Sequence, residues 1–135
     1  MSTRRESREC SLKMLYTFDN CKVSIENVYR FFDGYFPKSK VYKMFAISLF
    51  MGVCRNKEEI DSFINQYAKN WELDRMAVVD RNIIRLAVYE IMANRNIPIN
   101  VIIDEAVEIS KKYSTKNSGK FINGILDKLK LIRTL

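Results

Sequence analysis

The sequence contains no histidine, and it has only four glycines and two prolines in 135 residues. Without histidine, a Ser-His or Cys-His couple cannot form, and the commonest general base is missing. The three cysteines lack CxxC spacing, which argues against a metal site or a disulfide framework. We therefore expect no enzyme activity, no metal and no cofactor. Cys10, Cys21 and Cys54 are expected to be buried, because free cysteine behaves as a small hydrophobe.

Long apolar runs are also missing. None reaches the roughly 18 residues that indicate a membrane span, and the N-terminus is polar where a secretory signal is apolar. A cytoplasmic protein is therefore expected. With 135 residues and 47% hydrophobic side chains, the chain is long and apolar enough to form one domain, 1–135, with its own core.

Positive charge is concentrated at the two ends of the chain, whose net charge is +7. Residues 1–13 hold four basic and two acidic side chains, and residues 110–135 hold seven basic and one acidic. If the two ends meet in the fold, they form one basic face, which is typical of a nucleic-acid-binding protein. The alternative is that these lysines and arginines only keep a small helical protein in solution.

Apolar residues recur at spacings of three and four along the whole chain, and this period predicts an all-α fold. Seven helices are expected: one that begins at Thr3 and ends near Asp19–Asn20, one from about Ser24 that stops before Pro37, one over about 38–54, one capped by Asn56 that ends near Trp71, one over about 75–94, one with Pro98 in its first turn, and one that starts at Asn117 or Ser118.

Three arginines follow the first expected helix start, where Thr3 opens a T-x-x-E capping box. Cations at a helix N-terminus cost roughly 0.3–1 kcal/mol each at exposed sites. On a helical wheel, Arg4, Arg5 and Arg8 point to the same side of the helix as its apolar residues. Along the chain they lie one to three turns before those residues. We expect Arg4 and Arg8 to be exposed beyond the core and to contact a ligand there.

Three stretches carry a resemblance to a known family: RRESRECSLKMLY at 4–16, VDRNIIRLAVYEI at 79–91 and NIPINVIIDEAVEISKKYSTKNSGKFINGILDK at 96–128. Together they closely resemble the NusB family of bacterial transcription antitermination factors. The resemblance spans nearly the whole chain, although residues 20–70 add little beyond helical pattern. It implies a compact single-domain bundle of about seven helices in two packed halves.

The resemblance also implies a function. Proteins similar to NusB bind single-stranded boxA RNA together with ribosomal protein NusE, and they help to assemble a processive RNA polymerase complex on ribosomal RNA operons. One alternative is a NusB-like RNA-binding or protein-interaction module without antitermination activity. Because some proteins of this kind form homodimers that mask the RNA surface, a homodimer is an alternative to a monomer.

Site residues follow from the resemblance by position. The arginine-rich start of the first helix and the loop before the KF-NG-LDK signature form the RNA surface, and the nearby aromatic rings are candidates for base stacking. The expected RNA-binding residues are Arg4, Arg5, Arg8, Tyr16, Lys116, Asn117, Ser118, Lys120 and Phe121. Similar sequences often carry an acid where this chain has Asn117, so the loss of that negative charge favours RNA binding.

Two further expectations concern the stretch 79–91 and the last helix. Arg85 and Glu90 are expected to form ion pairs with NusE, with ordinary surface charge as the alternative. Glycine inside a helix costs about 1 kcal/mol relative to alanine. We therefore expect Gly119 to ease the turn into the last helix and Gly124 to allow close helix packing, with close approach of a ligand backbone as the alternative at Gly124.

Overall fold

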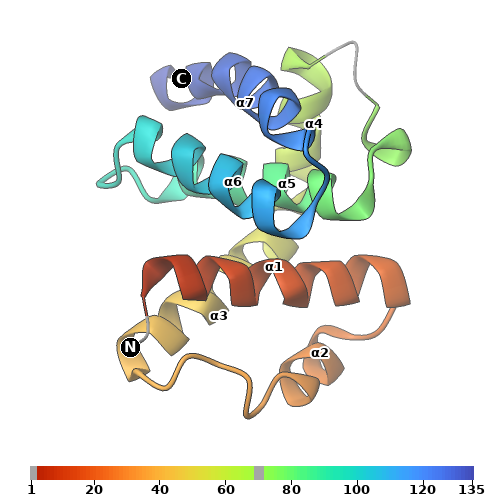
Figure 1. Ribbon diagram of the computed structural model, residues 1–135, viewed down its shortest axis with the longest axis vertical. Coiled ribbons are helices and arrows are strands. Elements are labelled where there is room, and N and C mark those ends of the chain that lie inside the picture. Colours follow the sequence, from red (N-terminus) through yellow and green to blue (C-terminus); the bar gives the residue numbers. More distant parts are fainter. Residues whose placement is uncertain (1–2, 69–71) are drawn as a thin grey trace. The chain divides into compact units, whose positions relative to one another are not determined.

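The computed structural model describes residues 3–68 and 72–135, and this part of the chain forms seven α-helices, two short 3-10 helices and no strand (Figure 1). The elements are α1 (Arg4–Cys21), α2 (Ile25–Phe31), α3 (Lys40–Arg55), α4 (Lys57–Tyr67), η1 (Leu73–Arg75), α5 (Val78–Ala93), α6 (Ile99–Tyr113), α7 (Ser118–Leu129) and η2 (Lys130–Thr134). The expected all-α fold of about seven helices is confirmed. Among the described helices, none combines a membrane-spanning length with sufficient apolarity.

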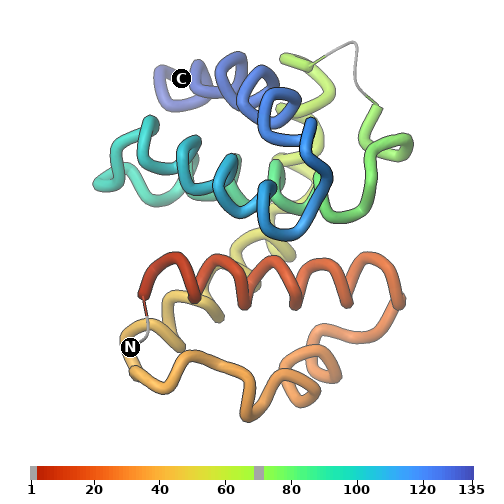
Figure 2. Tube along the Cα trace, viewed as in Figure 1, coloured from red at the N-terminus to blue at the C-terminus, as the bar shows by residue number. Residues whose placement is uncertain are grey.

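The chain divides into two compact units, Met1–Gly52 and Val53–Leu135. The trace in Figure 2 can be followed through α1, α2 and most of α3 in the first unit, and through α4 to η2 in the second.

Helix α1 packs against α3 in the first unit through two serines one helical turn apart. The hydroxyl of Ser7 donates to the carbonyl of Tyr42 at 2.9 Å, and that of Ser11 donates to the carbonyl of Ala46 at 2.6 Å. Both serines are buried, and so are the apolar side chains around them, among which are Leu12, Met14, Leu15, Val28 and Phe50. The small serine side chains allow the two helix backbones to approach closely.

The expected cap of Thr3 is confirmed, and Ser24 caps α2 in addition. The expectation that Asn56 caps α4 is wrong, because its side chain forms no capping bond to that helix. The side chain of Thr3 accepts a hydrogen bond from the Glu6 amide at 3.1 Å, and that of Ser24 accepts one from the Asn27 amide at 3.1 Å. These bonds satisfy amide groups that have no partner within the helix.

Helix α5 is the centre of the second unit, where it packs against α4, α6, α7 and η2. Because neighbours cover it on several sides, it buries polar as well as apolar side chains. Its buried polar residues are Asp80, Asn82, Arg85 and Glu90.

Some helix ends differ from expectation. Helix α2 ends at Phe31, well before Pro37, because the chain turns at Gly34, whose φ of 89° lies in the left-handed region. Helix α4 ends at Tyr67, and the expected end near Trp71 lies outside the described residues. The short helices η1 and η2 were not expected, since such short 3-10 segments leave no apolar period in the sequence.

The two glycines of α7 have different surroundings. A Cβ at Gly119 would meet the Val107 Cγ1 atom of α6 at 3.5 Å, which is ordinary contact, so this glycine lies where α7 approaches α6. A Cβ at Gly124 would meet nothing within 4 Å, and the residue is exposed. The expectation that Gly124 allows close helix packing is therefore wrong.

Replacing Gly124 with alanine is expected to raise the free energy of unfolding by about 0.5–1 kcal/mol, because alanine restricts the unfolded chain and meets no neighbour in the helix. Urea denaturation measures this change. Gly119→Ala is the matched control, and we expect a smaller gain there because its Cβ touches Val107. A loss of stability in Gly124→Ala would show that the position is crowded after all.

Candidate functional site

Two of the three N-terminal arginines are exposed at the start of α1. Arg4 and Arg5 lie in its first turn, and the guanidinium carbon of Arg4 is 5.7 Å from the ring centroid of Phe45 on α3. At this distance a guanidinium is attracted to the face of an aromatic ring. Arg4 is therefore held over α3 while its side chain remains open to solvent.

Arg8 is placed differently from Arg4. It is only 3% exposed, and its guanidinium carbon lies 5.6 Å from the centroid of the same Phe45 ring. The expectation that Arg8 is exposed is wrong. Arg8 lies on the same side of α1 as the apolar stripe, and one turn into the helix this side is already covered by neighbouring residues. Its role in RNA binding stays a prediction.

The turn between α6 and α7 presents a second group of cationic and polar side chains. Lys116, Asn117 and Lys120 are exposed there, and Phe121 is partly exposed. Asn117 is the cap residue of α7, and its side chain forms no capping bond to the helix. The positive end of the α7 dipole and the two lysines together favour an anion at this turn.

Ser118 is buried, and it belongs to a hydrogen-bond network around Asp80 of α5. Asp80 Oδ1 accepts from the Ser114 hydroxyl at 2.6 Å, and Oδ2 accepts from the Ser118 hydroxyl at 3.3 Å. The Ser118 hydroxyl also lies 2.9 Å from those of Ser114 and Thr115. The carboxylate therefore ties the α6–α7 turn to the first turn of α5.

A hollow of about 490 Å³ lies beside this network in the second unit. Its lining includes Arg75, Met76, Ala77, Asp80, Asn117 and Phe121. Sequence reasoning placed Asn117 and Phe121 in a site but missed Asp80. The sequence shows only that Asp80 is an acid in the first turn of an expected helix, and that several hydroxyl residues occur much later, at 114–118. It does not show that the two are in contact.

Arg85 and Glu90 are buried, with 5% and 2% exposure. Arg85 Nε donates to Asp61 Oδ1 at 2.8 Å, and Arg85 Nη2 donates to Asp61 Oδ2 at 3.1 Å. This is a two-pronged ion pair within the second unit. The surface position that both expectations assumed is wrong, because these side chains face the helices that surround α5; their role toward a partner stays a prediction.

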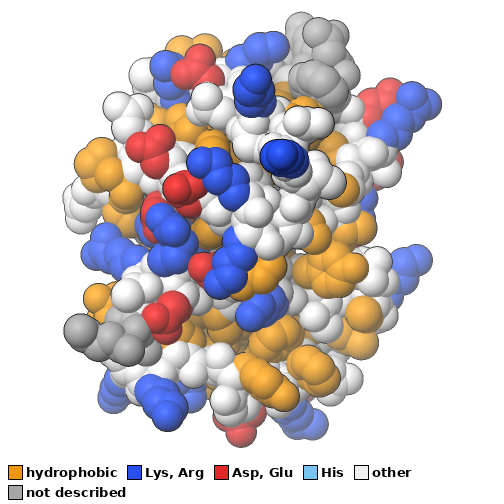
Figure 3. All heavy atoms as spheres, in the orientation of Figure 1, with side chains coloured by type: hydrophobic (Ala, Val, Ile, Leu, Met, Phe, Trp, Pro, Cys, Tyr) orange, Lys and Arg blue, Asp and Glu red, His pale blue; other side chains and the backbone are white. Residues whose placement is uncertain are grey.

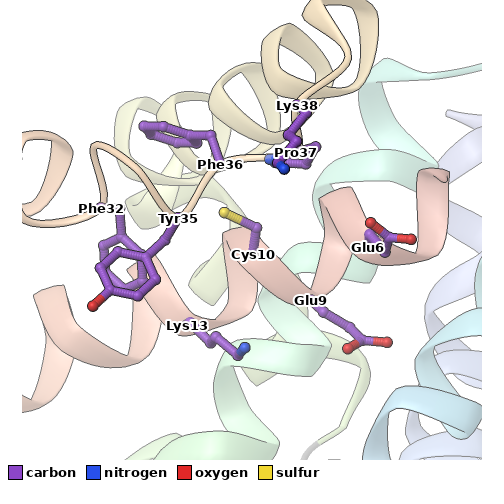
Figure 4. Close-up of a pocket in the computed structure, with 9 residues that line it drawn as sticks. All are labelled: Glu6, Glu9, Cys10, Lys13, Phe32, Tyr35, Phe36, Pro37 and Lys38. Atoms are coloured by element: carbon purple, nitrogen blue, oxygen red, sulfur yellow. The ribbon is translucent and has the colours of Figure 1, made fainter. Parts of the chain in front are cut away.

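The first unit has a hollow of its own, of about 530 Å³, between α1 and the segment 32–38 (Figure 4). Glu6, Glu9, Lys13 and Lys38 line it, so its acids and lysines balance, and it has no charge preference that would attract a phosphate. Burial raises the pKa of the Cys10 thiol in this hollow, and the opposing effect of Lys13 is smaller. Cys10 therefore stays protonated near neutral pH and is not an activated nucleophile.

Cys54 is not an activated nucleophile either. Burial raises the pKa of Cys54 to about 11, with a smaller opposing effect of Lys57. Cys21 is exposed, so the expectation of burial is wrong for this residue. Across residues 3–68 and 72–135, no cluster of three or more cysteine or acidic side chains is arranged to hold a metal ion.

Exposed apolar side chains are concentrated in the first unit, and in Figure 3 orange side chains gather where Figure 1 draws α2. The large exposed ones of this unit are Tyr16, Tyr29, Phe31, Tyr35, Val41 and Met44. Tyr16 is 39% exposed, so its ring is accessible at the surface. This exposed position is compatible with the base-stacking role that is expected for Tyr16.

The chain is similar to known proteins over nearly its full length. A sequence model of the NusB family matches residues 5–130. The transcription antitermination protein NusB of Trichlorobacter lovleyi is 46% identical over 129 residues, which cover 96% of this chain and 91% of the relative.

Solved structures agree with the family match. A structure of T. maritima NusB superposes with a TM-score of 0.86 at 40% identity, covering 96% of this chain and 91% of that one. A crystal structure of antitermination factors NusB and NusE in complex with dsRNA gives a TM-score of 0.85 at 27% identity, with coverage of 94% and 95%. With its sequence and its helical fold both matched over almost all residues, the chain belongs to the NusB family of transcription antitermination proteins.

Proposed function

We propose that this protein binds single-stranded boxA RNA together with NusE and helps to assemble a processive RNA polymerase complex on ribosomal RNA operons in the cytoplasm. The observation that carries the NusE and RNA parts of the proposal is the similarity, at 27% identity over 94% of the chain, to a protein solved with NusE and dsRNA. The single-stranded boxA target rests on the family resemblance. Two exposed cationic groups, one in each unit, support it.

The first group is the exposed pair Arg4 and Arg5. Their positive charges are repelled by the positive end of the α1 dipole, and bound phosphate oxygens offset this unfavourable energy. Guanidinium groups bind phosphate in a bidentate manner and also stack on bases, which suits them to RNA better than lysine. The unfavourable position in the free protein is thus an indication of anion binding.

The second group is the α6–α7 turn. Lys116 and Lys120 provide charge, and the exposed amide of Asn117 adds hydrogen-bonding capacity without the repulsion of an acid. Phe121 is partly exposed, and stacking of an unpaired base on its ring is part of the proposal. Ser118 contributes by holding the turn in place through Asp80.

Binding of a short unpaired boxA-like RNA, with and without NusE, tests the proposal. We expect selective binding over a scrambled RNA, an affinity that NusE increases, and a steep fall with salt because phosphates are neutralised. Equal weak binding of both RNAs with no effect of NusE contradicts the proposal. A weak dependence on salt favours a protein-interaction module without antitermination activity.

The double variant Arg4→Ala/Arg5→Ala is expected to lower RNA affinity about tenfold at moderate salt and to make the salt slope shallower by about 1.4, since each phosphate contact to a single strand contributes about 0.7. Fluorescence anisotropy in a salt series measures both quantities. Arg30→Ala/Arg55→Ala removes the same charge at two exposed arginines outside the proposed surface. Equal losses in the two double variants would mean that only net charge matters.

Contact of NusE with Arg85 and Glu90 also stays part of the proposal, but burial changes how it is tested. A Glu90→Lys variant replaces an acidic side chain by a basic one at a position that is 2% exposed, so we expect it to disturb folding first. Loss of NusE binding in this variant supports a partner contact only if its thermal unfolding is unchanged.

A further inference from the structure

We propose that Phe45 of α3 is a positioning residue for RNA binding, because its ring holds the guanidinium of Arg4 in place before a phosphate of the RNA arrives. This inference rests on the proposed function and adds to it an aromatic residue that acts through an arginine. Arg4 and Phe45 both belong to the first unit.

The ring of Phe45 contacts two cations of α1. The guanidinium carbons of Arg4 and Arg8 lie 5.7 and 5.6 Å from the centroid of this ring. The two arginines are four residues apart, so they lie on the same side of the helix. Arg8 is only 3% exposed, whereas Arg4 is exposed and Phe45 is partly exposed. The ring therefore extends from the packed side of α1 toward the surface, and Arg4 is the cation that a ligand can reach.

The backbone of α3 is tied to α1 on both sides of Phe45. The hydroxyls of Ser7 and Ser11 donate to the carbonyls of Tyr42 and Ala46 at 2.9 and 2.6 Å. Tyr42 lies three residues before Phe45 in α3, and Ala46 directly follows it. These hydrogen bonds hold the stretch of α3 that carries the ring against the first turns of α1. The ring is thus a fixed support for the arginine side chain.

Contact with an aromatic ring leaves the hydrogen-bonding groups of a guanidinium available. The attraction of a cation to the ring acts through the face of the ring and uses no hydrogen-bond acceptor. A bidentate phosphate contact uses N–H donors at the edge of the guanidinium plane. Arg4 can therefore bind a phosphate while it stays beside Phe45.

A side chain that is already held costs less entropy to immobilise when the ligand binds. Arginine has one of the largest losses of rotamer freedom among the side chains. The contact with Phe45 restricts Arg4 in the free protein, so part of this loss occurs on folding. Without the ring, the whole loss occurs when RNA binds, and we expect the affinity to fall roughly threefold to tenfold.

The first test is Phe45→Leu, which removes the ring and keeps the charge of Arg4. Fluorescence anisotropy with the boxA-like RNA should show the roughly threefold to tenfold loss of affinity. The salt slope should stay as in the wild type, because the number of neutralised phosphates is unchanged. Phe45→Tyr keeps the ring and should bind RNA as the wild type does. Thermal unfolding of both variants shows whether they are folded at the temperature of the assay.

Phe36→Leu is the matched control. Phe36 is also a partly exposed ring of the first unit, and the Lys43 Nζ atom lies 5.3 Å from its centroid. The substitution and the kind of contact are the same, but the cation is a different one. RNA affinity should not change in this variant. Equal losses in Phe36→Leu and Phe45→Leu would contradict the inference.

The second test combines Phe45→Leu with Arg4→Ala in a double-mutant cycle. If Phe45 acts through Arg4, Phe45→Leu lowers RNA affinity in the wild-type background and has no further effect once Arg4 is alanine. A merely structural role of Phe45 would lower the affinity by the same factor in both backgrounds, which overturns the inference. An unchanged affinity in Phe45→Leu or in Arg4→Ala overturns it as well.

The two proposals fail in different ways. If the wild-type protein binds boxA-like and scrambled RNA equally, the proposed function fails and the role of Phe45 falls with it. If the wild-type protein binds selectively but the two substitutions act independently, the function stands and the role assigned to Phe45 is wrong.

Discussion

Replacing Asp61 with alanine is expected to lower the free energy of unfolding by about 3 kcal/mol, because it removes the carboxylate that pairs with a buried guanidinium. The side chain of Arg85 is 6% exposed, and two of its nitrogens donate to Asp61 at 2.8 and 3.1 Å. The side chain of Asp61 is 21% exposed, so water reaches the ion pair. We therefore expect a loss of unfolding free energy at the lower end of the range that is usual when one partner of a buried ion pair is removed. Urea unfolding of the two proteins measures the difference.

Two comparisons isolate the cause of this loss. Glu108→Ala breaks an exposed pair with Lys111, and we expect a change below about 1 kcal/mol. The double variant Asp61→Leu/Arg85→Met removes both buried charges and should recover most of the stability. If Asp61→Ala costs no more than Glu108→Ala, the buried pair does not stabilise the second unit.

Replacing Arg133 with methionine is expected to lower the free energy of unfolding by about 2–3 kcal/mol, because it removes charged hydrogen bonds to carbonyl groups. Its guanidinium donates to the carbonyls of Ile91 at 3.0 Å, Ile97 at 2.7 Å, Asn94 at 3.2 Å and Glu90 at 3.4 Å. These carbonyls lie at and just beyond the C-terminal end of α5, where the helix dipole favours a cation. Burial, with a smaller effect of Arg95, lowers the pKa of the guanidinium from its ordinary value, but arginine stays charged in this setting.

Methionine keeps most of the length of the side chain at position 133. The loss of stability in this variant is therefore due more to the missing hydrogen bonds to carbonyl groups than to altered packing. Arg133→Lys should recover only part of the stability, since an ammonium group cannot reproduce the planar fork of donors. Arg95→Met removes an exposed guanidinium that donates to the Arg133 carbonyl, and it should have little effect. Thermal unfolding of the three variants ranks them; a loss in Arg95→Met equal to that in Arg133→Met would refute the capping role.

The helices were predictable from the sequence because their apolar period and their caps are local properties. Thr3 caps α1 as expected, and the positions of the seven helices follow the pattern closely. The burial of Arg85 was not predictable in this way. Its partner Asp61 lies 24 residues away in the sequence, and periodicity alone assigns a charged side chain to the surface.

The candidate site was predictable only in its exposed part. Lys116, Asn117 and Lys120 are exposed at a helix start, as the family resemblance implied. Asp80 was missed because its partners Ser114 and Ser118 are 34 and 38 residues away, and nothing local marks it as part of their turn. A hollow between separate elements depends on tertiary packing, which a single sequence does not show.

The serine contacts of α1 have a consequence for the entropy of RNA binding. Because Ser7 and Ser11 both bond to carbonyls of α3, α1 cannot rotate about its axis without breaking two hydrogen bonds. The backbone beneath Arg4 and Arg5 is then already ordered before any RNA arrives. Binding has to immobilise only their side chains, at about 0.5–1.5 kcal/mol each. Much of the entropic cost of forming this part of the complex is therefore met when the protein folds.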